Sequence, residues 1–444
     1  MERVNTLENN WDPCGFDYTT AVPFHPDEIR KYRNLYYTES WQNARQPPTR
    51  PNPVNSGALI RQNTPNDPRS GWKLHRVISG HRGIVHSIAV DPHNAGIDLS
   101  SDTNYQSNSS GNLFYTASAD CTIKCWDGLM GSCHLTLTGH TAGVRCLATS
   151  SEYPYIFSAG EDRDIRVWDL QGSVQRESDG TVRASKLLGT ANQTIAKLHG
   201  SLGCVYALSA HPRVPFLLAS GGSDGAVRVW DIRCNRCVFS FFGHKGTVET
   251  ICTQPTEPQF ISGGSDGTVH TWNLTAGKED TTGKDRPMHG AYKYHSKSIR
   301  ASFVHPTEHV FTSVSTDRIQ MWKLPSFEGL RSLSGTSRSE IPTLLGETVN
   351  AACVANGGEF FVTGHATGAL RFHDWKSGGC YLERREQSVS DMQLRLEARE
   401  KTSQSSFSEQ QRGVLAAVLN KQDNLLLSAL RDKTIHLYIN PEEH

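Results

Sequence analysis

The sequence lacks a long hydrophobic run. Its longest plainly apolar segment is Val414–Leu419, far short of the roughly 20 residues that a membrane-spanning helix needs. The opening residues, MERVNTLENN, contain no apolar core of a secretory signal. We therefore expect a soluble chain that is not secreted by that route and has no membrane partner.

The sequence also lacks an excess of charge of either sign. Lysine plus arginine and aspartate plus glutamate each number 45, so the formal net charge is zero. A neutral chain has no overall field that would draw it onto nucleic acid, so any contact with an RNA backbone must be local. Its 11 cysteines have no framework spacing, which favours a reducing compartment.

Motifs for cofactors and metals are missing as well. Cys234-x-x-Cys237 looks like half of a zinc site, but a closed zinc site needs four ligands and no second pair has matching spacing. We interpret the two cysteines as turn and strand residues. No glycine-rich loop opens a helix to hold a phosphate. The sequence predicts no cofactor, no metal and no small-molecule substrate.

What the sequence does contain is a repeated pattern, most complete in residues 139–169, GHTAGVRCLATSSEYPYIFSAGEDRDIRVWD. It begins with Gly-His, passes through two short apolar segments and a turn at an Asp, and ends with Trp-Asp. In most copies a Ser or Thr lies four residues before the turn Asp, and a Trp lies six residues after it. A period in the forties that ends in Trp-Asp is the signature of a WD-repeat β-propeller.

The copies number seven. Five sets combine a hydroxyl, an Asp and a Trp, the fifth being one residue short: Thr116/Asp120/Trp126, Ser158/Asp162/Trp168, Ser220/Asp224/Trp230, Ser262/Asp266/Trp272 and Ser313/Asp317/Trp322. Two further sets are degenerate: Thr363/Thr367/His373 and Ser428/Asp432/Tyr438. Upstream, the Gly-His position holds His81, His140, His244 and His295, whereas Ser201 and Glu347 replace the histidine in two copies. We predict a structural hydrogen-bond chain from the indole N–H through the hydroxyl and the imidazole to the carboxylate.

A Ser-His-Asp set also resembles the catalytic triad of a hydrolase. A catalytic nucleophile occurs once in an enzyme and needs an oxyanion hole and a cleft. Here the trio recurs along the chain, as structural parts do. We therefore predict that the protein has no catalytic residues and is not an enzyme.

The predicted architecture is an all-β, seven-bladed WD-repeat propeller over 72–440, preceded by an N-terminal arm over 1–71. The last repeat has only three strands, so the strand at 72–78, WKLHRVI, is expected to complete it and close the ring. The arm is rich in proline and is expected to be mostly extended, with a short helix near 26–41. Its aromatic residues Tyr32, Tyr36 and Trp41 either dock on a partner or fold back on the propeller.

Insertions between strands mark the variable surfaces. The segments at 94–111 and 171–190 are expected on one face, together with smaller ones near 277–291 and 325–342. The insertion at 383–411 is expected on the opposite face, either as a helix that folds on a partner or as a solvated loop.

Basic residues gather in the loops that hold the Gly-His and the turn Asp: Arg82, Arg163, Lys245, Lys297, Arg318, Arg431 and Lys433. This ring suits an acidic peptide or an RNA backbone, and the alternative is ordinary solvated loop charge. A separate tetrapeptide, Trp230-Asp231-Ile232-Arg233, is similar to the WD-x-Arg box of cullin-type ubiquitin-ligase substrate receptors. From that similarity we take the alternative function, a substrate receptor of a cullin-type ubiquitin ligase.

Blade-specific segments resemble the pleiotropic-regulator family of spliceosomal WD-repeat proteins. They are, in order, WKLHRVISGH (72–81), YPYIFSAGEDRDIRVWDL (153–170), VYALSAHP (205–212), VRVWDIR (227–233), Glu257-Pro258-Gln259, LTAGK (274–278), HSKSIRASFVHP (295–306), DWKSG (374–378) and DKTI (432–435). The resemblance implies a nuclear, non-catalytic scaffold in the Nineteen-complex-related part of the spliceosome, acting in pre-mRNA splicing. It also implies contact with a Myb-like Cdc-five scaffold and proximity to spliceosomal RNA, with at most local backbone contacts.

Overall fold

The computed structural model describes residues 71–91, 113–128, 130–170, 174–176, 182–184, 194–212, 214, 216–233, 235–254, 259–273, 288–316, 318–324, 328–333, 348–385 and 413–440. The regular elements within these ranges are β-strands. No helix in this part of the chain is long and apolar enough to cross a membrane.

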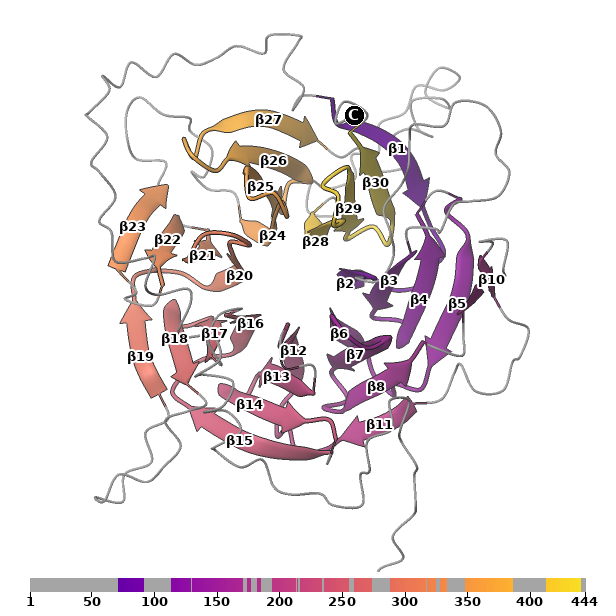
Figure 1. The fold of residues 1–444 in the computed structure, drawn as a ribbon, viewed down its shortest axis with the longest axis horizontal. Helices are drawn as coiled ribbons and strands as arrows, with labels where there is room; N and C mark the ends of the chain where they lie inside the picture. Colours follow the sequence, from indigo (N-terminus) through magenta and orange to yellow (C-terminus); the bar gives the residue numbers. More distant parts are fainter. Residues whose placement is uncertain are drawn as a thin grey trace, which may run out of the picture.

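Seven four-stranded antiparallel sheets stand in a ring as the blades of a propeller (Figure 1). The predicted all-β, seven-bladed WD-repeat propeller is thereby confirmed. In each blade the first strand lies nearest the axis and contacts the first strand of the next blade. The blades are numbered here from 1 to 7 in chain order, so that the network residues of each repeat lie in one blade.

The first four blades are built from consecutive repeats. Blade 1 contains β2 (Val85–Val90), β3 (Leu113–Ser118), β4 (Thr122–Asp127) and β5 (Cys133–Thr138). Blade 2 contains β6 (Val144–Thr149), β7 (Tyr155–Gly160), β8 (Ile165–Asp169) and β11 (Thr194–Leu198). Blade 3 contains β12 (Val205–Ala210), β13 (Leu217–Gly222), β14 (Ala226–Asp231) and β15 (Arg236–Phe242). Blade 4 contains β16 (Val248–Thr253), β17 (Gln259–Gly264), β18 (Thr268–Asn273) and β19 (Met288–Lys293).

The remaining blades follow the same plan. Blade 5 contains β20 (Ile299–Val304), β21 (Val310–Ser315), β22 (Ile319–Lys323) and β23 (Glu328–Leu333). Blade 6 contains β24 (Val349–Val354), β25 (Phe360–His365), β26 (Ala369–Asp374) and β27 (Cys380–Arg385). Blade 7 contains β28 (Val414–Leu419), β29 (Leu425–Leu430), β30 (Ile435–Ile439) and β1 (Lys73–Ile78). Between β8 and β11, β9 (Val174–Arg176) and β10 (Val182–Ala184) form a separate two-stranded sheet within the insertion at 171–190.

Blade 7 combines strands from both ends of the repeat array. Its strand order is β1-β30-β29-β28, with β1 on the outside. β1 runs antiparallel to β30, with Lys73 opposite Ile439 and Ile78 opposite Ile435. The strand expected over 72–78 therefore lies where the ring closes, beside the last strand of the chain (Figure 1).

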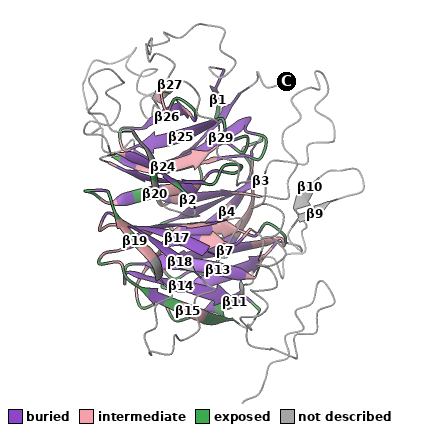
Figure 2. Ribbon diagram, turned by 60° about the vertical axis from the view of Figure 1, so that its left-hand side comes forward, coloured by how far each residue is buried: buried purple, intermediate pink, exposed green. Residues whose placement is uncertain are grey.

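The core lies between neighbouring blades. The second strand of a blade is covered on both faces, and all six residues of β3, β13, β17, β21, β25 and β29 are buried. In one cluster Trp126 of blade 1 packs with Leu427 and Ile435 of blade 7. Outer strands are more exposed, as Figure 2 shows for β15. The interlocked blade faces make the ring a rigid frame for its loops.

Several sequence predictions lie outside the described residues. These are the arm with Tyr32, Tyr36 and Trp41, the turn residue Asp317, the loop residue Glu347, the cysteine Cys234, and the insertions at 94–111, at 171–190 apart from β9 and β10, and at 383–411 apart from its first three residues.

Candidate functional site

The predicted hydrogen-bond chain has its full form in blade 2. Trp168 of β8 donates its indole N–H to Ser158 Oγ of β7 at 2.8 Å. His140, in the loop before β6, places Nε2 2.7 Å from the same oxygen and Nδ1 2.7 Å from Asp162 Oδ2. The chain ties two strands to the loop before the blade and to the turn between β7 and β8.

Blades 1, 4 and 5 repeat this arrangement with small differences. In blade 1, Thr116 Oγ1 lies 2.7 Å from both Trp126 Nε1 and His81 Nε2, and His81 Nδ1 lies 2.9 Å from Asp120 Oδ2. In blade 4, Ser262 Oγ lies 2.7 Å from both Trp272 Nε1 and His244 Nε2. In blade 5, Ser313 Oγ lies 2.9 Å from Trp322 Nε1 and 2.7 Å from His295 Nε2.

Blade 3 lacks the histidine, and an arginine contacts its turn aspartate instead. Trp230 still donates to Ser220 Oγ at 2.8 Å. Asp224 forms an ion pair with Arg228 of β14, with Oδ2 2.7 Å from Nη1. Ser201 stands at the histidine position, and its buried hydroxyl has no hydrogen-bond partner among the described residues. The short serine side chain does not reach the carboxylate, so the arginine neutralises it.

Blades 6 and 7 have replaced the tryptophan. In blade 6, Thr363 Oγ1 lies 3.0 Å from His373 Nε2 and 3.1 Å from His365 Nε2. Two imidazoles therefore surround the hydroxyl that an indole and an imidazole surround elsewhere. In blade 7, Ser428 and Tyr438 are both buried, and Asp432 accepts a hydrogen bond from the Thr434 backbone at 3.0 Å.

The electrostatics of the network suit a structural role. Burial lowers the pKa of His81 despite the nearby Asp120 carboxylate. Burial alone would raise the pKa of Asp120, but hydrogen bonds from Thr122 and His81 bring it well below its usual value. The pair thus consists of a neutral imidazole and a carboxylate near neutral pH. In blade 2 the Ser158 hydroxyl is fully buried and accepts a hydrogen bond from the Trp168 indole N–H, so it is not presented to a substrate.

The predicted basic residues lie beside this network at one end of the blades. The backbone N–H groups of Arg82 and Lys245 donate to Asp120 and Asp266, which brings each Gly-His loop against its turn. Six of the seven predicted residues are exposed: Arg82, Arg163, Lys245, Lys297, Arg431 and Lys433. Arg318 is half-buried, with its guanidinium carbon 5.3 Å from the centre of the Tyr294 ring.

Acidic neighbours offset part of this charge. Arg145 Nη2 lies 2.5 Å from Glu161 Oε1, close to the turn that holds Arg163. Glu161 and Asp164 also lie within two residues of the exposed Arg163, so acidic side chains stand among the basic ones at blade 2. The loop ends also expose Leu202 (73%) and Tyr294 (46%), two hydrophobic side chains that the sequence analysis did not single out.

Arg233, the residue behind the alternative function, packs against its own blade. Its Nη2 lies 2.8 Å from Asp231 Oδ2, and its Nε donates to Asp231 Oδ1 at 3.1 Å. Its guanidinium carbon lies 3.7 Å from the centre of the Phe216 ring. Through these contacts Arg233 has a structural role within blade 3.

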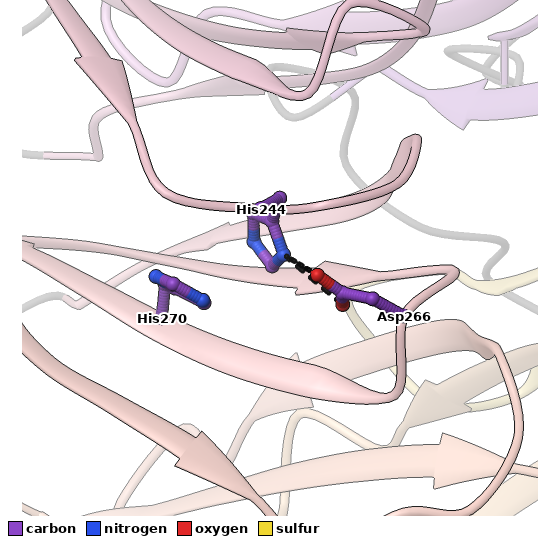
Figure 3. A group of neighbouring side chains, drawn as sticks. All are labelled: His244, Asp266 and His270. Atoms are coloured by element: carbon purple, nitrogen blue, oxygen red, sulfur yellow. Dashed lines mark hydrogen bonds and ion pairs between the residues drawn. The ribbon is translucent and has the colours of Figure 1, made fainter.

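One group of metal-ligating side chains escaped the sequence analysis. His244, Asp266 and His270 of blade 4 bring their ligand atoms within 4.8 Å of one another (Figure 3). The first two belong to the predicted network, but His270 has no place in the repeat pattern. It lies eight residues after Ser262, where blades 1, 2, 3 and 6 carry Lys124, Arg166, Arg228 and Arg371. Comparing the copies at that spacing would have found it.

Comparison with known proteins supports the repeats directly. The family described as "WD domain, G-beta repeat" matches residues 72–127, 131–169, 192–231 and 235–273. These segments cover blades 1 to 3 and most of blade 4. The fold of blades 5 to 7 follows from the structure.

Two groups of curated relatives are similar to parts of the chain. Nuclear distribution protein PAC1-2 of Uncinocarpus reesii is 29% identical over 213 residues, 48% of this chain and 44% of that protein. Pre-mRNA-splicing factor PRP46 of Candida albicans is 39% identical over 109 residues, 24% of each chain. PRP46 of Debaryomyces hansenii is 45% identical over 93 residues, 21% of this chain and 18% of that protein. The chain spans less than half the length of these relatives.

Proposed function

We propose that this WD-repeat β-propeller is a non-catalytic, nuclear scaffold for protein interactions in the spliceosome. In this proposal it acts in pre-mRNA splicing within the Nineteen-complex-related assembly, in contact with a Myb-like Cdc-five scaffold and near spliceosomal RNA. The observation that carries the proposal is the identity to the two PRP46 splicing factors, 39% and 45% over their matched segments. The nuclear distribution protein matches a longer segment at 29%.

The architecture supports a scaffold. Each buried network fixes the loops at one end of its blade, so the charged loop residues project from a rigid ring. Such a ring presents several surfaces at fixed distances, as assembly of a multi-protein complex requires. Fold alone does not determine the partners, so the splicing assignment depends on the sequence similarity.

Copurification tests the assignment. The tagged full chain is isolated from nuclear extract at moderate salt, where sequence-independent charge contacts are weak, and its partners are identified by mass spectrometry. We expect splicing proteins and spliceosomal RNA. Recovery of nuclear-distribution proteins without splicing factors contradicts the proposal. Recovery of a cullin adaptor that disappears with Arg233→Ala supports the alternative function instead.

We also propose that the basic loop residues make local contacts with an acidic peptide or an RNA backbone. The triple charge reversal Arg163→Glu, Arg318→Glu and Arg431→Glu tests this surface. It is expected to weaken partner binding and to reduce the salt dependence of that binding. Unchanged binding and unchanged salt dependence would assign these residues to ordinary solvated loops. Exposed Arg236 of β15, reversed to Glu, is the matched control on the outer strand.

A further inference from the structure

Blade 4 carries a second imidazole beside its network histidine. His270 of β18 lies opposite Ser262 of β17, and its ring centroid is 4.1 Å from that of His244. The same register position holds Lys124, Arg166, Arg228, Gln320, Arg371 and His436 in the other blades. In blade 7 the sequence has Gln410 where other repeats have the network histidine. That position therefore supplies no imidazole beside His436.

The His–Asp contact of blade 4 is wider than its counterparts. His244 Nδ1 lies 3.3 and 3.4 Å from the two Asp266 oxygens, against 2.9 Å in blade 1 and 2.7 Å in blade 2. His244 Nε2 lies 2.7 Å from Ser262 Oγ. Thr268 Oγ1, which donates to Asp266 Oδ1 at 2.6 Å, also lies 3.1 Å from His244 Nδ1. Without a metal ion, the Nδ1–H group is therefore shared between the Asp266 carboxylate and the Thr268 hydroxyl.

We propose that His244, Asp266 and His270 bind a divalent transition-metal ion such as Zn²⁺. Two neutral imidazoles and a carboxylate are a common ligand set for zinc. Ligands of a tetrahedral zinc ion lie about 3.3 Å apart, given bonds of about 2.0–2.1 Å. The separation between His244 Nδ1 and Asp266 Oδ1 already fits this value. All three ligand atoms lie within 4.8 Å of one another (Figure 3), so small side-chain rotations complete the site.

The surroundings hold two of the three ligands in place. Asp266 accepts hydrogen bonds from the backbone of Lys245 at 2.8 Å and from the hydroxyl of Thr268 at 2.6 Å. Ser262 fixes the far nitrogen of His244. Such outer partners orient metal ligands and increase affinity. Two of the three ligands are therefore oriented before an ion arrives.

Two glycines lie so close to the ligand side chains that a larger residue at either position would crowd them. A Cβ at Gly264 would lie 2.5 Å from His244 Nδ1 and 2.6 Å from Asp266 Oδ1. A Cβ at Gly243 would lie 3.0 Å from His270 Nδ1. The Asp266 side chain remains 13% exposed, whereas that of His244 is fully covered. An ion can therefore enter from the side of the aspartate, with water as its fourth ligand.

The competing explanation is a metal-free pair of neutral imidazoles. His270 also stacks on Trp272, with ring centroids 5.3 Å apart and an interplanar angle of 17°. That stacking accounts for a flat aromatic ring at position 270. The Thr268 hydroxyl, 3.1 Å from His244 Nδ1, accounts for the wide His244–Asp266 contact. Neither contact accounts for the convergence of three ligand atoms within 4.8 Å.

Zinc titration of the full chain, stripped of metal with a chelator, tests the proposal. Binding is measured by calorimetry in the presence of a weak competing chelator, because the chain has 19 histidines and 11 cysteines, and such side chains outside the site can bind zinc loosely. The variants are His270→Gln, which removes the ligand, and His270→Arg, which installs the residue of blades 2, 3 and 6. The matched control is His436→Gln, which removes a buried imidazole at the same register position of blade 7. Thermal melting of each metal-free variant establishes that it folds.

We expect one tight zinc site in the wild type and in His436→Gln, and at least about tenfold weaker binding in both His270 variants. Cobalt in place of zinc should give a visible absorption band in the wild type that is lost in His270→Arg. Equal zinc affinity in the wild type and the folded His270→Arg variant would overturn the proposal. Absence of a tight zinc site in the wild type would overturn it as well.

Discussion

The indole ring of Trp72 lies 5.5 Å from the phenyl ring of Phe372, measured between centroids. Trp72 directly precedes β1, the outer strand of blade 7, whereas Phe372 lies in β26 of blade 6. The indole also meets Phe360 edge-on at 6.3 Å, and only 1% of Trp72 is exposed. The start of the propeller is thus held both by pairing with β30 and by aromatic packing on the neighbouring blade.

The first prediction concerns this anchor. Trp72→Ala should lower the free energy of unfolding by about 3–5 kcal/mol, because it removes a large buried ring and leaves a cavity between blades. Urea unfolding followed by circular dichroism measures the change. Leu74→Ala in the same strand, where the side chain is 40% exposed, is the control and should cost less than about 1 kcal/mol. Equal costs for the two variants would rule out the anchor.

The second prediction separates the parts of the buried network. Ser158→Ala leaves the Trp168 indole and the His140 imidazole without their shared partner. Ser220→Ala in blade 3 leaves only the Trp230 indole, since blade 3 has no histidine at this position. An unsatisfied buried polar group costs about 1–3 kcal/mol. Ser158→Ala should therefore destabilise the protein by at least about 1 kcal/mol more than Ser220→Ala. A difference below about 1 kcal/mol between the two variants would argue against the network.

The third prediction is an acid sensitivity of blade 6. Burial, reinforced by the nearby charges of His365 and Arg371, lowers the pKa of His373 from 6.5 to about 3. Below pH 6.5 the unfolded chain therefore binds a proton that the folded chain does not, so stability falls as the pH falls toward 3. For one histidine this loss is at most about 1.4 kcal/mol per pH unit.

His373→Gln removes the imidazole that takes up this proton in the unfolded chain. The stability lost between pH 7.5 and pH 5.5 should be about 1.4 kcal/mol smaller in the variant than in the wild type. Urea unfolding at the two pH values measures both losses. Identical losses would show that His373 is protonated in the folded protein or that it titrates alike in both states.

The fourth prediction concerns a contact between blades 6 and 7. Asp423, in the turn after β28, accepts the backbone N–H groups of Asn356 and Gly357, each at 2.8 Å. Asp423→Ala should destabilise the protein by about 2–4 kcal/mol, because hydrogen bonds to charged groups contribute more than neutral ones. Asp423→Asn keeps one acceptor oxygen and should cost about half as much. Similar melting temperatures for wild type and Asp423→Ala would contradict this role.

The repeat spacing was sufficient to predict the ring and most of its buried polar network. A hydroxyl four residues before a turn Asp, and a Trp six residues after it, fix the two sides of one hairpin. That is why the contacts of Ser158 with Trp168 and of Thr116 with Trp126 could be predicted without coordinates. The closing strand followed from counting strands in the last repeat.

The rest depends on cross-strand register and on contacts between blades, which the spacing pattern does not encode. Arg228 pairs with Asp224 because the residue opposite the network serine points toward the turn, and the same register brings His270 to His244. Thr363 contacts His373 at the tryptophan position of the repeat, but its second partner, His365, lies two residues further along β25 and has no place in the repeat pattern. The contact of Asp423 with Asn356 joins turns from different repeats, so no pattern within one repeat predicts it.

Intron retention tests the proposed splicing function most directly. The chain is depleted from cells of its own organism, and spliced and unspliced transcripts are counted by RNA sequencing, with re-expression of the wild-type chain as the control. We expect unspliced introns to accumulate across many transcripts within the time of depletion and to return to normal on re-expression. Unchanged splicing after complete depletion would contradict the proposed role, while leaving the seven-bladed fold and the zinc-site proposal to be judged on their own measurements.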